Sequence, residues 1–387
     1  MASYIYLRSS LPVINIRVWP PTKISYTLKD INSQNYGDDR LKISAQIKAY
    51  DISKRVLSSS ARLNSGLTLG WIPFWDQGPA FASFKQHPDL FSHVSLFWYL
   101  LRSDGSVKKY IYAQEDASII NFARARGVKV LALVANLPDE DEGGDWDAVR
   151  VNKVIGTAPA REKHIADLVS LAKRKGFDGI NIDYEALKGY QKESFTLFIK
   201  DLASELHQNG KILAVALHPK LRENDPAYSN GSQAQDWGKL AGYADQLHLM
   251  TYEQHWETSG PGPIAAAPWV KSILNYAKRL IPSYKLFAGV PLYGYDWGGG
   301  AKAEGLTYQE VQSLINKYKP KIVWDSSAQT HHFSYNAGGT GHSVWYEDNS
   351  SFNAKLDLFN SLGVPNLAFW RLGGEDTRVW PTLRNSL

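Results

Sequence analysis

The feature that most constrains the fold is a pattern that recurs along the chain: a helical stretch, a glycine, and then an apolar, β-rich run. The glycines are Gly127, Gly176, Gly210 and Gly363. Glycine is the usual residue at a helix end, and the stretches before Gly176 and Gly210 carry the one-sided apolar stripe of helices that pack on a sheet. Helices that alternate with strands in this way form parallel sheets, so the sequence predicts an α/β protein.

Eight apolar runs have the length and composition of strands. They cover residues 67–74, 93–99, 128–135, 178–185, 211–217, 245–252, 285–292 and 365–370. Eight parallel strands with helices between them predict a closed (β/α)8 barrel, the TIM barrel. Such a barrel takes about 250 residues and tolerates insertions, so residues 67–387 fit one barrel with one excursion.

The excursion follows the seventh predicted strand, at residues 297–346. It starts with Gly298-Gly299-Gly300, includes a helical stretch at 307–318 and continues with short β-like runs, which together predict a small α+β insertion. Residues 1–66 have a different character, with polar and alternating stretches. We expect them to form an N-terminal extension, either a small β element or a linker.

One predicted strand carries carboxylates. Within residues 178–185, Asn181, Asp183 and Glu185 share one face, because side chains alternate across a strand. The surrounding strands look apolar on both sides, so this polar face is expected to be buried. Two neighbouring carboxylates disfavour each other's ionisation, and one of them should therefore stay protonated. A proton donor beside an anion is what the cleavage of a glycosidic bond requires.

Aromatic residues gather near the carboxyl ends of the predicted strands, where barrel active sites are built. Any single one of them could equally fill the core. Their shared position favours a polysaccharide groove, because aromatic faces pack against sugar rings. The residues concerned are Trp71, Trp75, Trp98, Tyr99, Tyr252, Trp256, Tyr293, Trp297 and Trp370.

Composition excludes several other classes of function. The 43 basic and 38 acidic residues leave a charge of +5, but the basic residues are dispersed and form no nucleic-acid-binding motif, so we expect no nucleic-acid partner. The absence of Cys excludes disulfides and thiolate chemistry. His331-His332 lacks the spacing of metal ligands, and no glycine-rich stretch reads as a phosphate loop. No metal and no cofactor are therefore expected.

Two features of the sequence bear on the location of the protein. No run of about 18 apolar residues is present, so no membrane span is expected. The first residues lack the charged start and long apolar run of a signal peptide. We expect a monomer.

Residues Asp178 to Glu185 match the pattern Asp-Gly-x-x-x-Asp-x-Glu, and in this the chain resembles glycoside hydrolase family 18, the chitinase-like (β/α)8 barrels. Met250-Thr251-Tyr252-Glu253 is similar to the Met-x-Tyr-Asp motif of that family, and Trp370 ends the last predicted strand. Three further segments resemble bacterial spore-cortex and cell-wall N-acetylglucosaminidases, namely residues 290–297, 344–348 and 369–373.

This resemblance implies a retaining hydrolase in which the acetamido carbonyl of the substrate attacks the anomeric carbon. Glu185 would protonate the leaving oxygen and then activate water. Asp183 would orient the acetamido nitrogen and balance its positive charge. Tyr252 would donate its hydroxyl to the acetamido oxygen, and Trp370 would form the floor beneath the sugar. An extracellular, cell-wall or spore location follows from the same resemblance.

Two positions depart from the family pattern. Asn181 stands where many chitinases have a third Asp, and we hypothesise that it hydrogen-bonds Asp183. Glu253 replaces the Asp of Met-x-Tyr-Asp, and its longer side chain is expected to reach the sugar hydroxyls. The other predicted substrate contacts are Trp98, Tyr293 and Trp75.

Alternative functions remain open at this point. A carbohydrate-binding barrel without activity would usually lack the acid, whereas Glu185, Asp183 and Tyr252 are all present. A structural or assembly barrel is a third possibility. Chitin, chitooligosaccharides and peptidoglycan all offer the required acetamido group. The resemblance to the cortex enzymes favours peptidoglycan or its cortex fragments, with a chitinase as the alternative.

Overall fold

The computed structural model describes residues 13–18, 22–27, 66–223, 225 and 231–386. The chain divides into two compact units, Met1–Asn64 and Ser65–Leu387. In the first unit the structure describes one antiparallel pair, β1 (Val13–Val18) with β2 (Thr22–Thr27). Apart from this pair, the predicted extension up to residue 65 lies outside the described residues.

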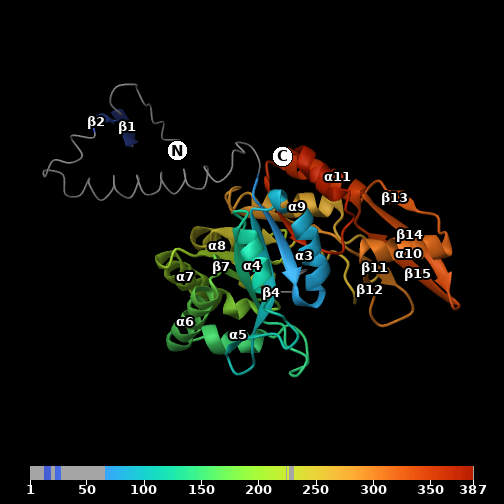
Figure 1. Ribbon diagram of the computed structural model, residues 1–387, viewed down its shortest axis with the longest axis horizontal. Coiled ribbons are helices and arrows are strands. Elements are labelled where there is room, and N and C mark those ends of the chain that lie inside the picture. Colours follow the sequence, from blue (N-terminus) through green and yellow to red (C-terminus); the bar gives the residue numbers. More distant parts are fainter. Residues whose placement is uncertain (1–12, 19–21, 28–65, 224, 226–230, 387) are drawn as a thin grey trace. The chain divides into compact units, whose positions relative to one another are not determined.

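The second unit is built on a closed barrel of eight parallel strands (Figure 1). Each strand pairs with the next, and β16 pairs back to β3. The strands are β3 (Thr68–Pro73), β4 (His93–Leu101), β6 (Lys129–Ala135), β7 (Gly179–Asp183), β8 (Ile212–Leu217), β9 (Gln246–Leu249), β10 (Leu286–Pro291) and β16 (Asn366–Trp370). A short strand, β5 (Val107–Lys109), adds to β4 in the antiparallel sense. All eight predicted strands are present, and the (β/α)8 prediction is confirmed.

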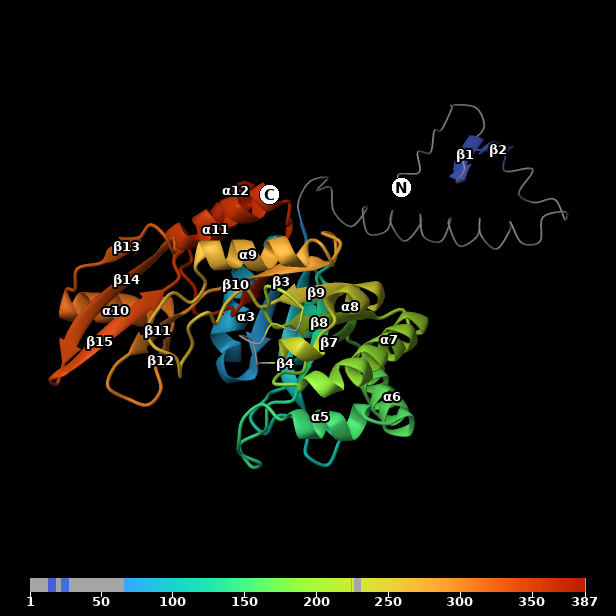
Figure 2. The same cartoon turned by 180° about the vertical axis from the view of Figure 1, so that it is seen from behind.

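Helices cover the outside of the barrel, and Figure 2 shows α6, α7 and α8 beside β7 and β8. They are α3 (Gln77–Gln86), α4 (Ala117–Arg124), α5 (Ala148–Ile155), α6 (Ala158–Lys175), α7 (Lys192–Gln208), α8 (Trp237–Tyr243), α9 (Ala267–Ala277), α11 (Asn349–Leu362) and α12 (Val379–Ser386). Gly127, Gly176, Gly210 and Gly363 all have positive φ, between 63° and 74°. Glycine adopts this left-handed conformation without strain, which explains the recurring glycine in the sequence.

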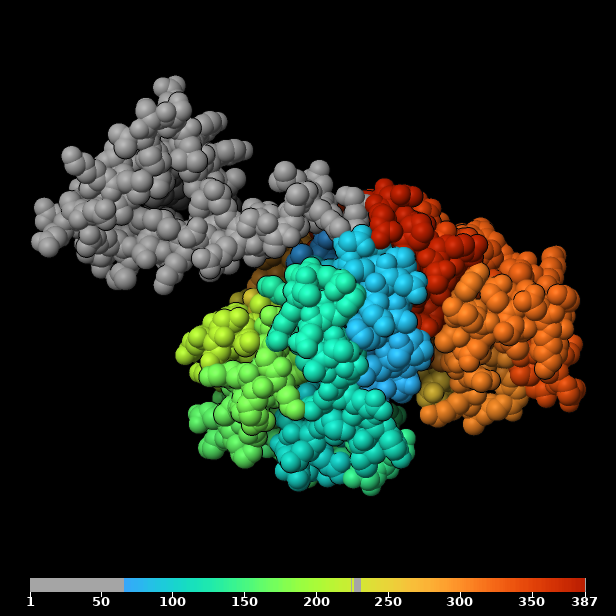
Figure 3. All heavy atoms as spheres, in the orientation of Figure 1, coloured from blue at the N-terminus to red at the C-terminus, as the bar shows by residue number. Residues whose placement is uncertain are grey.

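The excursion between β10 and α11 forms a separate α+β lobe beside the barrel (Figure 3). A five-stranded antiparallel sheet has the order β12-β11-β15-β14-β13, and one helix packs on it. The elements are β11 (Gly294–Trp297), β12 (Glu304–Leu306), α10 (Tyr308–Tyr318), β13 (Val323–Asp325), β14 (Thr330–Ala337) and β15 (Thr340–Tyr346). The lobe has its own small core, which includes Val311, Phe333 and Val344.

Two strands, β7 and β9, end more than one residue earlier than predicted, and both differences concern the candidate site. β7 ends at Asp183 and β9 ends at Leu249, so Glu185 and Tyr252 lie on the loops just beyond. Ala186 and Glu253 have φ values of 54° and 60°, which a strand cannot accommodate. The sequence pattern suggested longer strands because the apolar alternation continues past the last ladder hydrogen bond.

Gly179 allows β7 to lie close to β8, and its replacement should destabilise the barrel. A Cβ atom there would lie 2.2 Å from the backbone oxygen of Ile212, which cannot rotate away. We expect Gly179→Ala to lower the free energy of unfolding by about 1–3 kcal/mol. In α8, nothing lies within 4 Å of a Cβ on Gly242, so Gly242→Ala should raise it by up to about 1 kcal/mol. Urea denaturation of both variants tests this, and effects of the same sign would contradict it.

Candidate active site

Glu185 lies at the mouth of the barrel, just after β7, where its backbone is fixed from the neighbouring strand. Asn136, the residue after β6, accepts a hydrogen bond from the Glu185 N–H (2.8 Å) and donates one to the Glu185 carbonyl oxygen (3.0 Å). Asn136 is fully buried. These two hydrogen bonds hold the Glu185 backbone at a defined position, although Glu185 lies beyond the last residue of the strand.

The environment of Glu185 favours its protonated form. Burial raises the pKa of its carboxyl well above the usual value, and the charges of Asp183, Glu253 and Asp145 raise the pKa further. A carboxylate removed from water without a cation beside it is costly, so the group keeps its proton to a higher pH. Glu185 can therefore act as a proton donor near neutral pH.

Asp183 ends β7 with its side chain inside the barrel. Its exposure is 7%, and its Oδ1 atom has no hydrogen-bond partner among the described residues. Burial raises the pKa of this carboxyl to about 7. Asp183 and Glu185 thus both keep their protons to a higher pH than ordinary carboxyl groups do.

The predicted hydrogen bond from Asn181 to Asp183 is wrong. The Asn181 Oδ1 atom instead accepts from the Trp71 indole N–H (3.3 Å) and from the Ser95 hydroxyl (3.2 Å), and the Asn181 amide points to the Ile182 carbonyl oxygen (3.4 Å). Asn181 lies two residues deeper in the barrel than Asp183, and its partners are therefore on β3, β4 and its own strand. This leaves Asp183 Oδ1 free for a ligand.

Tyr252 follows β9 and lies near the carboxyl cluster. Its side chain is 5% exposed. Burial raises the pKa of its hydroxyl well above the usual value, and the charges of Asp183, Glu185 and Glu253 raise the pKa further. Gly289 on β10 provides room for the ring, because a Cβ there would lie 2.7 Å from the Tyr252 Cε1 atom. Tyr252 therefore stays a neutral hydrogen-bond donor.

Glu253 is bound by two tyrosines. Tyr293 donates its hydroxyl to the Glu253 Oε1 atom, and the Tyr295 hydroxyl lies 3.2 Å from the same oxygen. Burial raises the pKa of Glu253 to about 7, and the two phenol hydrogen bonds oppose this effect by lowering the pKa. The structure thus brings Tyr293 to the site, but its hydroxyl contacts Glu253 and is not free.

Aromatic rings line the barrel mouth beside the carboxyls. Trp370 ends β16 and is partly exposed, and its ring lies 5.8 Å from Trp71 and 6.2 Å from Trp75 between centroids. Trp75 is 49% exposed. These partly exposed faces offer an apolar surface to a flat ligand.

The prediction of Trp98 as a substrate contact is wrong. Trp98 is fully buried, its indole N–H donates to the Gln77 side chain (2.5 Å), and its ring packs on Phe177 at 6.3 Å. The pairing of β4 with β6 is irregular between Phe97 and Tyr99, and Gln77 is the first residue of α3, so Trp98 faces a covering helix and not the barrel interior. Trp98 was predicted to contact substrate because it lies near a strand end, but that position does not determine which way the side chain points.

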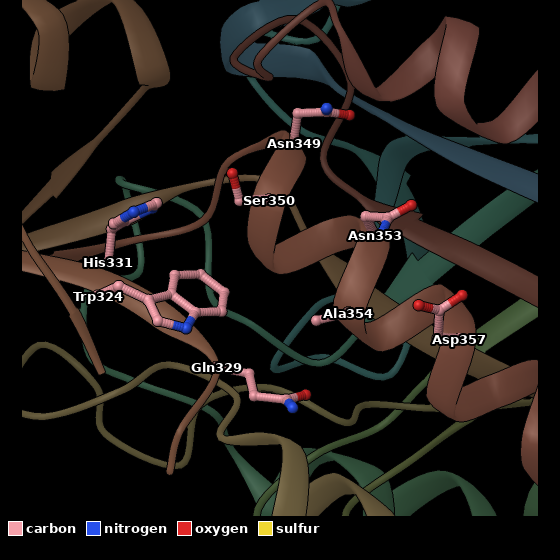
Figure 4. Close-up of a pocket in the computed structure, with 8 residues that line it drawn as sticks. All are labelled: Trp324, Gln329, His331, Asn349, Ser350, Asn353, Ala354 and Asp357. Atoms are coloured by element: carbon pink, nitrogen blue, oxygen red, sulfur yellow. The ribbon is translucent and has the colours of Figure 1, made fainter. Parts of the chain in front are cut away.

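A hollow of about 580 Å³ lies elsewhere, between the lobe and α11 (Figure 4). Trp324 and His331 line it from the lobe, and Asn353 and Asp357 line it from α11. The hollow shares no lining residue with the carboxyl cluster and contains a single carboxylate. It lacks the paired acids of glycosidic chemistry, and we therefore place the candidate active site at the barrel mouth.

Two buried carboxyls beside aromatic rings, at the carboxyl end of a (β/α)8 barrel, are the arrangement of a glycoside hydrolase. The family model of the glycosyl hydrolases family 18 matches residues 81–375, more than half of the chain. The chain belongs to this family and is a glycosidase.

Several curated relatives come from species of Bacillus. The chain is 28% identical over 268 residues to the uncharacterized glycosylase YvbX of Bacillus subtilis, covering 68% of this chain and 77% of the relative. It is 26% identical over 298 residues to the cortical fragment-lytic enzyme of Bacillus anthracis, covering 76% of this chain and 67% of the relative. The chain thus spans about two thirds of that enzyme's length.

Solved structures share the same fold. A chitinase from Chromobacterium violaceum is 28% identical with a TM-score of 0.74, and the match covers 83% of this chain and 99% of the chitinase. The spore cortex-lytic enzyme SleL of Bacillus megaterium is 25% identical with a TM-score of 0.75, and the match covers 85% of this chain and 75% of SleL. Among the described residues, no helix is long and apolar enough to cross a membrane.

The sequence reasoning missed several residues that contact this cluster. Asn136 fixes the Glu185 backbone, Tyr295 binds Glu253, and the His218 Nε2 atom lies 3.3 Å from the Glu185 Oε2 atom. Asn136 and His218 each come directly after an apolar strand, on either side of β7 in the barrel. A polar residue directly after an apolar strand is therefore the sequence feature that could have identified both of them.

The raised pKa of Glu253 predicts how stability depends on pH. The folded protein holds this proton up to about pH 7, whereas an unfolded Glu releases it near its ordinary pKa of 4.5. The contribution of Glu253 to stability is therefore full below about pH 4.5 and is lost as the pH rises through 7. In Glu253→Gln, the free energy of unfolding should fall less between pH 4.5 and 7 than in the parent.

Urea denaturation at several pH values measures this difference. Glu162→Gln, a change at an exposed position on α6, is the matched control and should keep the parent's slope. The same pH dependence in parent and Glu253→Gln would contradict the prediction.

Proposed function

We propose that the protein cleaves β-1,4 bonds next to N-acetylglucosamine with retention of configuration, by substrate-assisted catalysis. The observation that carries this proposal is the cluster of Asp183, Glu185 and Tyr252 at the barrel mouth, in which burial raises the pKa of both carboxyls and neighbouring charges raise that of Glu185 further. The membership in family 18 supports it.

Glu185 is the proposed general acid and base. Its raised pKa lets it carry a proton to the leaving glycosidic oxygen, and the resulting carboxylate can then take a proton from water. The two hydrogen bonds between Asn136 and the Glu185 backbone hold the residue at the barrel mouth for both steps. A fixed donor removes part of the entropic cost of the reaction.

Asp183 and Tyr252 are the proposed partners of the substrate's acetamido group. The Asp183 Oδ1 atom has no partner among the described residues and can accept a hydrogen bond from the acetamido nitrogen. As the acetamido oxygen attacks the anomeric carbon, the nitrogen gains positive charge, which the Asp183 carboxylate stabilises. Tyr252, which stays neutral, can donate to the acetamido oxygen. Trp370 and Trp75 are proposed to form the apolar floor beneath the sugar. Asn181 lies deeper in the barrel, beneath Asp183.

Peptidoglycan or its cortex fragments are the proposed substrate, at the cell wall or spore. The relationship to cortical fragment-lytic enzymes and to SleL supports this choice. A chitinase activity on chitooligosaccharides is the second candidate, which the likeness to the Chromobacterium violaceum chitinase favours. We further propose that the chain acts as a monomer.

Glu185→Gln tests the acid. This change keeps the size of the side chain but removes the transferable proton, so turnover should fall about 100- to 10,000-fold while sugar affinity stays close to that of the parent. Mass spectrometry of products from muramidase-digested peptidoglycan and from chitooligosaccharides measures turnover and substrate together. Release of N-acetylglucosamine from the fragments is expected, and cleavage of chitooligosaccharides alone would establish the second candidate.

Two further measurements complete this test. Glu162→Gln, at an exposed position on α6, should behave as the parent. Proton NMR of the first product formed should show the β-anomer if the configuration is retained. An α-anomer would overturn substrate assistance, and no product from either substrate would overturn the proposed function.

A further inference from the structure

The pairing of β7 with β8 brings a histidine to the acid. The register pairs Ile182 with Val215, an offset of 33 residues. Continued to the strand ends, the same offset sets Glu185 beside His218. In parallel strands, side chains at paired positions point to the same side of the sheet, so both are directed to the barrel mouth.

The two side chains lie within reach of each other. The His218 Nε2 atom is 3.3 Å from the Glu185 Oε2 atom but is not aligned for a hydrogen bond, and it has no hydrogen-bonding partner among the described residues. Hydrogen bonds in unliganded active sites are often long and tighten when substrate binds. His218 is 4% exposed, so water does not easily take the place of Glu185.

His218 is held rigidly in this position. Its backbone N–H donates to the Gln235 side chain (2.8 Å). The loop after β8 returns over the ring at Gly231, where a Cβ would lie 3.0 Å from both the His218 Cδ2 atom and the Ala186 nitrogen. Gly231 has a φ of 118°, which disfavours any other residue there. The ring therefore has little room to turn away from Glu185.

His218 is a neutral partner and not a cation. Burial lowers the pKa of its imidazole to about 3, so the ring is uncharged at any pH at which Glu185 is ionised. A neutral imidazole carries one N–H, and an N–H on Nε2 can serve both protonation states of Glu185. It donates to the carbonyl oxygen of the protonated acid and equally to the carboxylate.

We propose that His218 is a positioning residue, which donates its Nε2–H to the Glu185 Oε2 atom and leaves Oε1 as the oxygen that transfers the proton. This inference rests on the proposed role of Glu185 as the acid. Without the donor, the carboxyl could turn and place its proton on the oxygen that faces away from the sugar. The histidine thus fixes which oxygen reacts.

The donor also affects the ionisation of Glu185. A hydrogen bond to a carboxylate stabilises the charged form, so its loss should raise the pKa of Glu185 further. The other charges that face Glu185 are Asp183 on its own strand, Asp145 after β6 and Glu253 after β9, and all three raise that pKa. On the loop after β8, Lys220 is already paired with Glu223 at 2.8 Å.

His218→Leu and His218→Gln test the inference together. In His218→Leu, kcat should fall about 10- to 100-fold, the effect expected for a hydrogen bond to a charged group, with KM little changed. The basic limb of the kcat/KM profile should move to higher pH. His218→Gln retains an N–H donor and should recover part of kcat and of the pH profile. If His218→Leu leaves the basic limb in place, or if Gln fails to rescue, the inference is overturned.

A direct titration makes the result independent of turnover. The pKa of Glu185 can be followed by carbon NMR with labelled Glu side chains, and Glu185→Gln assigns the signal. The pKa should be higher in His218→Leu than in the parent, and an unchanged pKa overturns the inference even if the parent proves inactive. His164→Leu is the control, because His164 is equally buried but bonds Tyr184 (2.7 Å) outside the barrel. A shift of the same size in this control would also overturn it.

Discussion

Burial of carboxyl groups without a basic counter-ion is the constraint on which the rest of the site depends. Asp183 is inside the barrel because side chains alternate along β7, and the closed wall leaves it only the mouth as a route to water. Ionising such a group costs free energy unless a cation or several donors compensate. The cluster therefore retains protons to higher pH, and this is the property that an acid catalyst needs.

A second buried acid shows the other solution to the same problem. Glu347, at the end of the lobe, is 5% exposed and forms an ion pair of 2.7 Å with the buried Lys355. Among the described residues, neither Lys nor Arg forms an ion pair with Asp183, Glu185 or Glu253. The buried acid outside the site is thus neutralised by a lysine. The acids at the mouth are instead surrounded by neutral tyrosine and histidine side chains.

The sequence predicted the barrel because glycine-ended helices and apolar strands are local signals that survive in the structure. It predicted less well which way a side chain points and what it contacts. Trp98 is near a strand end but faces the helices, and Asn181 bonds Trp71 across the barrel instead of Asp183. Asn136 and His218 could not be assigned, because their contact with Glu185 depends on the register between strands, which no local pattern contains.

The segment that leads into the lobe also contacts the carboxyl cluster at the barrel mouth. Tyr293 follows β10 and Tyr295 lies on β11, so the chain binds Glu253 with two phenols as it leaves the barrel. Gly294, between them, lets this turn lie against β15, because a Cβ there would be 2.7 Å from the Tyr346 Cβ atom. The phenols lower the pKa of Glu253 while burial raises it, and the balance falls at about 7. Because the charge of Glu253 in turn raises the pKa of Glu185, the packing of the lobe helps to set the acidity of the proposed catalytic acid.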